Sequence, residues 1–128
     1  MKHKLIFLFI LTLCLGMLSV ISFADSPPAT LTIDGVFFSE FPSVQEAVDA
    51  IEANAGTDFV VEIAAGTVTD PLDVIQHLDK NIVIRPQAGA TVTFTNTINI
   101  DGRGQLNNSA TLLIEGLNYD LTSGTQQR

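Results

Sequence analysis

Apolar and polar residues alternate along most of the chain from Phe59 onward. The alternation is clearest between Lys80 and Gly104, where three short stretches each hold apolar residues at every second position. A period of two residues is typical of a β-strand with one buried face. The loops between these stretches are too short to hold helices. The sequence therefore predicts a region of short strands joined by corners.

The cores of these strands recur at similar intervals. Ile84 follows Ile63 by 21 residues, and Ile114 follows Ile84 by 30. The second step becomes about 22 if the insert Gly102–Ser109 is set aside, and a helix-free repeat of about 20–25 residues is typical of a solenoid. Like strands then stack in parallel, with inward side chains in ladders. The side chains expected to point inward include Ile63, Ile82, Ile84, Ile98, Ile100, Leu112 and Ile114.

A sandwich of β-hairpins is the alternative arrangement for the same strands. It would use two-residue Asn-Gly or Asp-Gly turns between matched strands. Asp34-Gly35 and Asp101-Gly102 are the two dipeptides that qualify. The repeat favours the solenoid over the sandwich.

One helix precedes the strands, between Ser43 and Asn54. Ser43 and Glu46 form the capping-box pattern at its start. Its apolar residues follow the helical spacing i, i+3, i+4, i+7 and form one stripe, which must pack on another element. The stripe consists of Val44, Ala47, Val48 and Ile51. Just before the helix, Phe37, Phe38 and Phe41 are expected in the core, with a sugar-stacking platform as the functional alternative.

Four phrases of the sequence resemble the N-terminal part of a right-handed parallel β-helix of the pectate-lyase-like superfamily. They are SVQEAVDAIEAN (43–54), FVVEIAAGTVTDPLDV (59–74), KNIVIRPQAGATVTF (80–94), and INIDGRG (98–104) with SATLLIEGLNYD (109–120). The resemblance covers about Thr30 to Leu121. It implies an all-β solenoid, a right-handed parallel β-helix of about two and a half rungs, with an N-terminal capping α-helix over its open end. Asn118 matches a tight-turn asparagine of the family, and Asn81 and Asn99 are expected at corners or in ladders.

The lyases and esterases of that superfamily carry their catalytic groups on later rungs than this chain contains. The resemblance therefore transfers no catalytic, cofactor-binding or metal-binding residue to this sequence. Asp70, Asp73 and Asp79 offer oxygen ligands of the kind Ca²⁺ prefers, but they lack a calcium-loop motif, and a solvated acidic corner is the preferred interpretation. His77 has no histidine or cysteine partner for metal or triad chemistry and is expected at a surface corner.

Three further polar segments receive structural interpretations. Arg85 is expected to form an ion pair with a carboxylate on the neighbouring strand. The glycines of 101–104 lack the Lys, Ser or Thr of a phosphate-binding loop and indicate a flexible insert. Asn107-Asn108-Ser109 is a glycosylation motif in form only.

The N-terminus has the form of a secretory signal. Met1–Lys4 is basic, Leu5–Phe23 has no charge, and Ser22-Phe23-Ala24 places small residues where a signal peptidase reads. We expect cleavage after Ala24. The uncharged run of 19 residues is also long enough for an uncleaved membrane anchor, which is the alternative.

The predicted organisation is a signal peptide at 1–24, a linker at 25–29, an N-terminal strand and capping helix at 30–58, β-helix rungs at 59–121 and a disordered tail at 122–128. The predicted mature chain has no cysteine, which favours a bacterial exported protein over a disulfide-stapled eukaryotic one. The chain has 14 acidic residues, and only Lys80, Arg85, Arg103 and Arg128 are basic after Ala24. Such a surface repels nucleic acid and anionic lipid.

The sequence thus predicts a secreted or cell-surface, non-catalytic module with a structural, adhesive or glycan-binding role, as the N-terminal portion of a larger protein. A polysaccharide is the candidate ligand. An alternative is the N-terminal fragment of a polysaccharide lyase or pectinesterase-like enzyme without its catalytic rungs. A third interpretation is a small independent protein that dimerises through its open end. Because the last rung, Ala110–Leu121, has no successor, self-association through it is expected.

Overall fold

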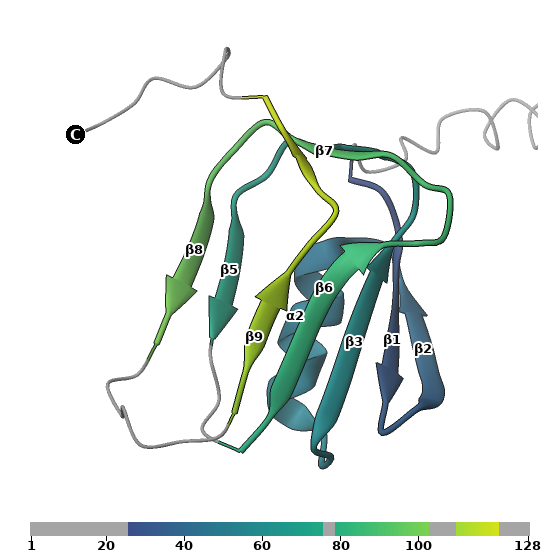
Figure 1. Ribbon diagram of the computed structural model, residues 1–128, viewed down its shortest axis with the longest axis vertical. Coiled ribbons are helices and arrows are strands. Elements are labelled where there is room, and N and C mark those ends of the chain that lie inside the picture. The colour runs from purple at the N-terminus through teal and green to yellow at the C-terminus, as the bar shows by residue number, and fades with distance from the viewer. Residues whose placement is uncertain (1–25, 76–78, 103–109, 121–128) are drawn as a thin grey trace, which may run out of the picture.

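The structure is a computed structural model, and it describes residues 26–75, 79–102 and 110–120. Ten strands and one helix follow one another along these residues (Figure 1). They are β1 (Ala29–Ile33), β2 (Val36–Phe41), α2 (Val44–Ala53), β3 (Asp58–Ile63), β4 (Gly66–Val68), β5 (Leu72–Ile75), β6 (Asn81–Pro86), β7 (Val92–Phe94), β8 (Ile98–Asp101), β9 (Leu112–Ile114) and β10 (Asn118–Tyr119). The strands form three sheets, with the orders β2-β1-β3-β6-β9, β10-β7-β4 and β5-β8.

An antiparallel hairpin begins the largest sheet. β1 pairs with β2 through a tight turn at Asp34 and Gly35, whose φ angles are 50° and 80°. Positive φ at both central residues is the requirement of the two-residue turn that best matches the twist of a hairpin. β1 also pairs antiparallel with β3, so that the hairpin becomes one end of the five-stranded sheet.

Parallel pairs complete the three sheets. β3 pairs with β6 and β6 with β9, while β4 pairs with β7 and β7 with β10, and β5 pairs with β8. In the largest sheet the register aligns Val61 with Ile84 and Ile84 with Ile114. Val61 and Ile84 are fully buried in one apolar core, which also includes residues of β4, β5 and β7.

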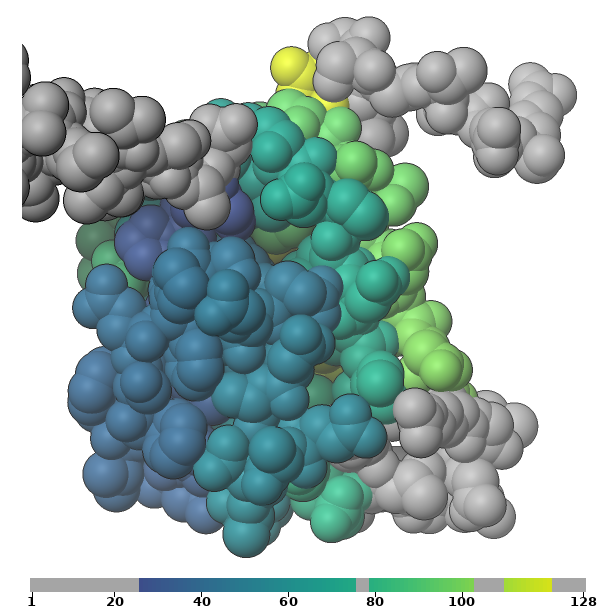
Figure 2. Space-filling model, turned by 180° about the vertical axis from the view of Figure 1, so that it is seen from behind, coloured from purple at the N-terminus to yellow at the C-terminus, as the bar shows by residue number. Residues whose placement is uncertain are grey.

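The helix predicted between Ser43 and Asn54 is confirmed. Ser43 is the N-cap of α2, and its hydroxyl oxygen accepts a hydrogen bond of 3.3 Å from the Glu46 amide. All four residues of the predicted stripe are buried. α2 packs against β1, β2, β3 and β5, and in Figure 1 it lies behind the five-stranded sheet. Figure 2, seen from behind, shows the blue helix region beside the teal and green strands β5 and β8.

A lysine from another part of the chain completes the C-terminal end of α2, which has no basic residue in its own last turn. Lys80 is 8% exposed, and its Nζ donates to the carbonyl oxygens of Ile51 at 2.6 Å and Asn54 at 2.9 Å. Its Nζ also lies 5.1 Å from the centre of the Phe59 ring. The last carbonyls of a helix have no partner within the helix, and a cation there also interacts favourably with the helix dipole.

The prediction of an all-β solenoid, a right-handed parallel β-helix, is wrong for the described residues. The largest sheet is mixed, because β1 runs antiparallel to both β2 and β3, and the strands are divided among three separate sheets. α2 packs along β1, β2, β3 and β5 and does not fulfil the expected role of a lid on a β-helix. The physical reason begins at Asp34-Gly35, which forms the hairpin turn that the alternative arrangement would use.

Several side-chain assignments are corrected with the fold. Ile63 aligns with Pro86, so that Ile63, Ile84 and Ile114 do not occupy matching positions. Ile100, expected to point into a ladder, is 55% exposed. Phe37 and Phe38 are exposed on β2 and are not core residues, whereas Phe41 is partly buried against the core.

Asp34 gives the fold an acid-sensitive contact. Its Oδ1 accepts hydrogen bonds of 2.9 Å from the amides of both Thr57 and Asp58, and these bonds lower the pKa of Asp34 below its usual 3.8. A lowered folded-state pKa stabilises the protein above pH 3.8, and this contribution is lost as the pH falls through the folded-state value. We therefore expect the wild type to melt at a higher temperature than Asp34→Asn at pH 6.

The difference between the two melting temperatures should shrink progressively below pH 3.8. Asn is the replacement chosen for Asp34, because its side-chain oxygen accepts the same hydrogen bonds without a charge and it tolerates a positive φ. Thermal melts of both proteins at several pH values between 6 and 2 would measure the effect. A difference that stays constant over this range would show that the charge of Asp34 makes no contribution.

Candidate functional site at the open sheet edges

Each of the three sheets ends in a strand from the C-terminal part of the described chain. β9 is the last strand of the five-stranded sheet, β10 of the three-stranded sheet and β8 of the two-stranded sheet. Each pairs with a described strand on one side only. An edge strand presents a row of backbone donors and acceptors that can pair with another chain. The three edges therefore form the first candidate site, which we call the open edge (β8, β9 and β10).

The apolar side chains of the open edge are less buried than those that occupy the matching positions one strand earlier. Val74 on β5 is 1% exposed, and its partner Ile100 on β8 is 55% exposed. Phe94 on β7 is fully buried, whereas its partner Tyr119 on β10 is 47% exposed. Ile84 is likewise fully buried, while Ile114 is partly exposed. The matching apolar positions are thus buried on β5, β6 and β7 and partly or largely exposed to solvent on β8, β9 and β10.

Tyr119, on the edge strand β10, is packed against the core on one side and exposed on the other. Its ring stacks on Phe94 with the ring centres 6.0 Å apart. Partial burial raises the pKa of the Tyr119 phenol, and a hydrogen bond with the backbone of Ile98 opposes this effect. One face of the ring is therefore held on the core while the residue as a whole remains half exposed. A ring placed in this way adds little entropy cost to an interface, because it is already ordered.

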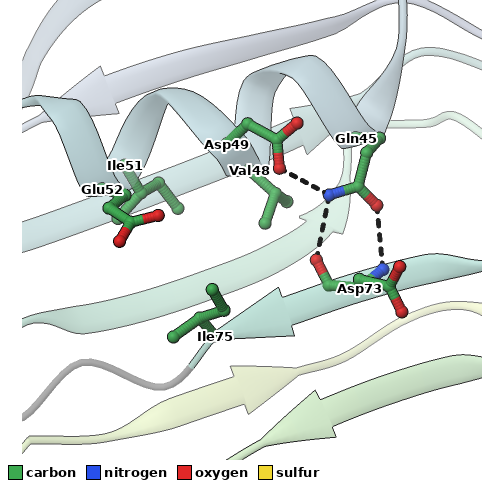
Figure 3. Close-up of a pocket in the computed structure, with 7 residues that line it drawn as sticks. All are labelled: Gln45, Val48, Asp49, Ile51, Glu52, Asp73 and Ile75. Carbon is green, nitrogen blue, oxygen red and sulfur yellow. Dashed lines mark hydrogen bonds between the residues drawn. The ribbon is translucent and has the colours of Figure 1, made fainter.

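A groove between α2 and β5 is the second candidate (Figure 3). It has a volume of about 270 Å³, with Val48, Ile51 and Ile75 as apolar lining and Asp49, Glu52 and Asp73 as carboxylates. Gln45 closes one end: its Nε2 donates to Asp49 Oδ1 at 2.7 Å and to the Asp73 carbonyl at 3.0 Å. Its Oε1 accepts from the Asp73 amide at 2.8 Å. The Gln45 amide thus pairs with the backbone of β5 as a neighbouring strand would, which explains the groove as part of the α2–β5 packing.

The structure does not bring the candidate calcium ligands together. Asp73 Oδ1 accepts a hydrogen bond of 2.7 Å from Asn99 Nδ2, and Asp70 and Asp79 are exposed elsewhere on the chain. Within the described residues, no group of three or more His, Cys, Asp or Glu side chains is placed to hold a metal ion. His77 lies outside the described residues, as do residues 103–109 with the glycosylation motif.

The predicted ion pair of Arg85 is confirmed. Arg85 aligns with Glu62 on β3, and its Nη2 lies 3.0 Å from Glu62 Oε1. Both side chains are well exposed, so that the pair contributes at most about 1 kcal/mol to stability.

The three asparagines occupy different environments. Asn81 connects β6 with β3 and with the residue directly before β9, because its Nδ2 donates to Asp58 Oδ1 at 2.8 Å and its Oδ1 accepts from the Thr111 amide at 3.0 Å. Asn99 pairs across β8 and β5 with Asp73. Asn118 lies within β10, and not at the turn that the family resemblance implied.

The sequence did not indicate Gln45 or Lys80 as important residues. Each makes hydrogen bonds to backbone atoms 26 or more residues away in the chain, and neither interrupts the local periodicity. A capping residue within α2 can be recognised from the sequence. Lys80, which lies directly before β6 and 26 residues beyond Asn54, cannot be recognised as a cap in this way.

No protein-family model, curated protein or solved structure matches the chain. The resemblance to the pectate-lyase-like superfamily therefore has no support from known proteins, and the fold that it implied is not the one observed. Among the described residues, none of the helices combines the length and hydropathy needed to cross a bilayer. The signal peptide expected at 1–24 lies outside the described residues and stays a prediction.

Proposed function

We propose that the chain is a non-catalytic association module of an exported protein, and that it binds a second copy of itself through the open edge. The observation that carries this proposal is the loss of burial at the matching apolar positions of β8, β9 and β10. Export is supported by the sequence pattern of residues 1–24 alone. Carbohydrate binding, expected from the family resemblance, gains no support from the described residues or from the comparisons.

The open edge offers two sources of binding energy. Burying a large apolar side chain completely is worth about 1.5–3 kcal/mol, and Ile100, Leu113 and Tyr119 are each 47% exposed or more. The backbone of β9 offers additional hydrogen bonds to any strand that lies beside it. A two-fold axis would place two β9 strands antiparallel, in a closed dimer in which both copies use the same surface.

The net charge of the chain opposes this association. The formal charge is −8 at pH 7, so that two copies repel each other at low ionic strength. Salt screens such repulsion within a Debye length of about 10 Å at 0.1 M. Dimerisation should therefore strengthen as the salt concentration rises, which is the opposite of an association held by ion pairs.

Sedimentation velocity of the processed protein, from Asp25, tests the proposal. We expect a concentration-dependent dimer that strengthens between about 0.02 and 0.5 M salt. Ile100→Lys should raise the dissociation constant about tenfold or more, because it places a desolvated charge in the interface. Val36→Lys is the matched control, since Val36 is 70% exposed on β2, at the opposite end of the sheet order. A monomer at about 100 µM, or equal weakening by both variants, contradicts the proposal.

A further inference from the structure

One row of residues, apolar except for Thr32, crosses the outer face of the five-stranded sheet from β2 and meets the open edge at Leu113 on β9. Thr32 aligns with Phe37 on one side and with Val60 on the other. Val60 aligns with Val83, and Val83 with Leu113. Directly paired residues lie on the same face of a sheet. These residues alternate along β3 and β6 with buried core residues such as Phe59 and Ile84, so that the row faces away from the core.

A β-bulge widens the row at the β2 end. The register between β1 and β2 shifts between Leu31 and Thr32, which leaves Phe38 as an extra residue beside Phe37. An extra residue of this kind interrupts the alternation, and two successive side chains can then share a face. Phe37 is 65% exposed and Phe38 47% exposed. We call the row of Phe37, Phe38, Thr32, Val60, Val83 and Leu113 the outer stripe.

Polar rows lie on both sides of the outer stripe. On one side the aligned residues are Glu40, Thr30, Glu62 and Arg85. On the other side, Asp58 aligns with Asn81, which bonds to Thr111. These rows carry three carboxylates and one guanidinium, which is already paired with Glu62. The other basic residue of the described chain, Lys80, is buried under α2.

The dimensions of the outer stripe follow from sheet geometry. Five strands about 4.8 Å apart give a stripe about 19 Å long, and polar rows two residues away along each strand lie about 7 Å to either side. In Figure 1 no described helix or strand lies in front of β1, β2, β3 and β6. α2 packs on the other side of β1, β2 and β3. The stripe is thus a narrow apolar line on an acidic surface that no described element covers.

We propose that the outer stripe docks a basic amphipathic helix of another polypeptide. An α-helix with apolar residues at i, i+3, i+4 and i+7 presents a linear apolar ridge, and about 13 residues span 19 Å at a rise of 1.5 Å. Lysines or arginines on both sides of that ridge lie over Glu40 and Glu62 on one side and over Asp58 on the other. A second copy of this chain is the poorer occupant, because the sequence has only 6 Lys and Arg residues against 14 Asp and Glu, and both basic residues within the described ranges, Lys80 and Arg85, are already engaged.

Fluorescence anisotropy with model peptides tests the docking. The probe is a peptide of about 14 residues, made of leucine and lysine only, with leucines at the helical spacing. One control peptide has glutamate in place of lysine, and a second has the same leucines and lysines in scrambled order. We expect the probe to bind most tightly, the scrambled peptide at least about tenfold more weakly and the glutamate peptide not at all.

Variants of the stripe decide whether binding occurs there. Phe37→Ser combined with Val83→Thr should weaken binding about tenfold or more, and Glu40→Gln about threefold, at low salt. Val36→Ser is the matched control, because Val36 neighbours Phe37 on β2 but pairs with Ile33 on the other face. If the double variant has a lowered melting temperature, the single variant Phe37→Ser is tested instead, because the Phe37 side chain is largely exposed and its replacement should not unfold the protein.

Three outcomes would overturn the proposal. They are equal binding of the ordered and scrambled peptides, equal effects of Phe37→Ser and Val36→Ser, and a change in the oligomeric state of Phe37→Ser without a change in peptide binding. The last would identify the stripe as a contact between copies. Leu113 is left unchanged throughout, so that the test does not alter the open edge and its result is independent of the proposed dimer.

Discussion

Replacing Lys80 with Met is expected to lower the free energy of unfolding by about 2–4 kcal/mol, because each buried acceptor left without a donor costs about 1–3 kcal/mol. Met retains the apolar stem over Phe59 but cannot donate to the carbonyls of Ile51 and Asn54. The carbonyls of Ile51 and Asn54 then lose the lysine as donor, and the end of α2 loses its nearby cation, while Asn54 Nδ2 still donates to the Ala50 carbonyl at 2.7 Å. Urea denaturation followed by circular dichroism would measure the loss.

Arg85→Met is the matched control for Lys80→Met. It removes the other basic side chain of the described residues, but the ion pair with Glu62 is exposed and worth at most about 1 kcal/mol. The loss of unfolding free energy in Lys80→Arg should lie between those of the other two variants. The charge is kept, but the planar guanidinium fits the cluster of carbonyl oxygens poorly. Equal destabilisation by Lys80→Met and Arg85→Met would mean that the carbonyls at the end of α2 form hydrogen bonds with water in place of the lysine.

Replacing Ile84 with Asp is expected to abolish cooperative folding. Ile84 is fully buried between Val61 and Ile114 in the largest sheet. Burying a carboxyl group there costs about 5 kcal/mol or more, which is comparable to the whole stability of a small domain, about 5–15 kcal/mol. The variant should show no melting transition and no near-ultraviolet circular dichroism signal.

The same substitution at Ile100 is the control, because Ile100 occupies a corresponding apolar position but is 55% exposed. Ile100→Asp should fold, with a loss below about 1 kcal/mol at a concentration where the protein is monomeric. Alanine substitutions at the same two positions give measurable losses in the free energy of unfolding. Ile84→Ala should cost about 2–5 kcal/mol and Ile100→Ala below about 1 kcal/mol. Similar melting temperatures for Ile84→Asp and Ile100→Asp would contradict the assignment of Ile84 to the core.

Local elements could be predicted from this sequence because their signals are local. Ser43, Glu46 and four apolar residues at helical spacing lie within a few residues of one another and define α2. The alternation after Phe59 likewise marks strands, since one face of each strand packs on the core. Both signals report how a short segment divides its surface between core and solvent, which does not depend on the neighbouring strand.

The arrangement of strands could not be predicted in the same way, because it depends on contacts between distant segments. The spacing of strand cores suggested matching positions for Ile63 and Ile84, but the register places Val61 opposite Ile84. The antiparallel course of β1 depends on one turn at Asp34-Gly35. The exposure of Ile100 depends on whether another strand lies beside β8, and that of Phe37 on the face of the sheet to which the β2 register assigns it. Alternation along one strand reports neither.

The Gln45 side chain has a consequence for how this protein can grow by assembly. By bonding to both the amide and the carbonyl of Asp73, it occupies the backbone positions where a further strand would attach to β5. The two-stranded sheet therefore has a blocked end at β5 and an available end at β8. Any lengthening of that sheet must occur at β8, so that one glutamine restricts the addition of strands to a single side.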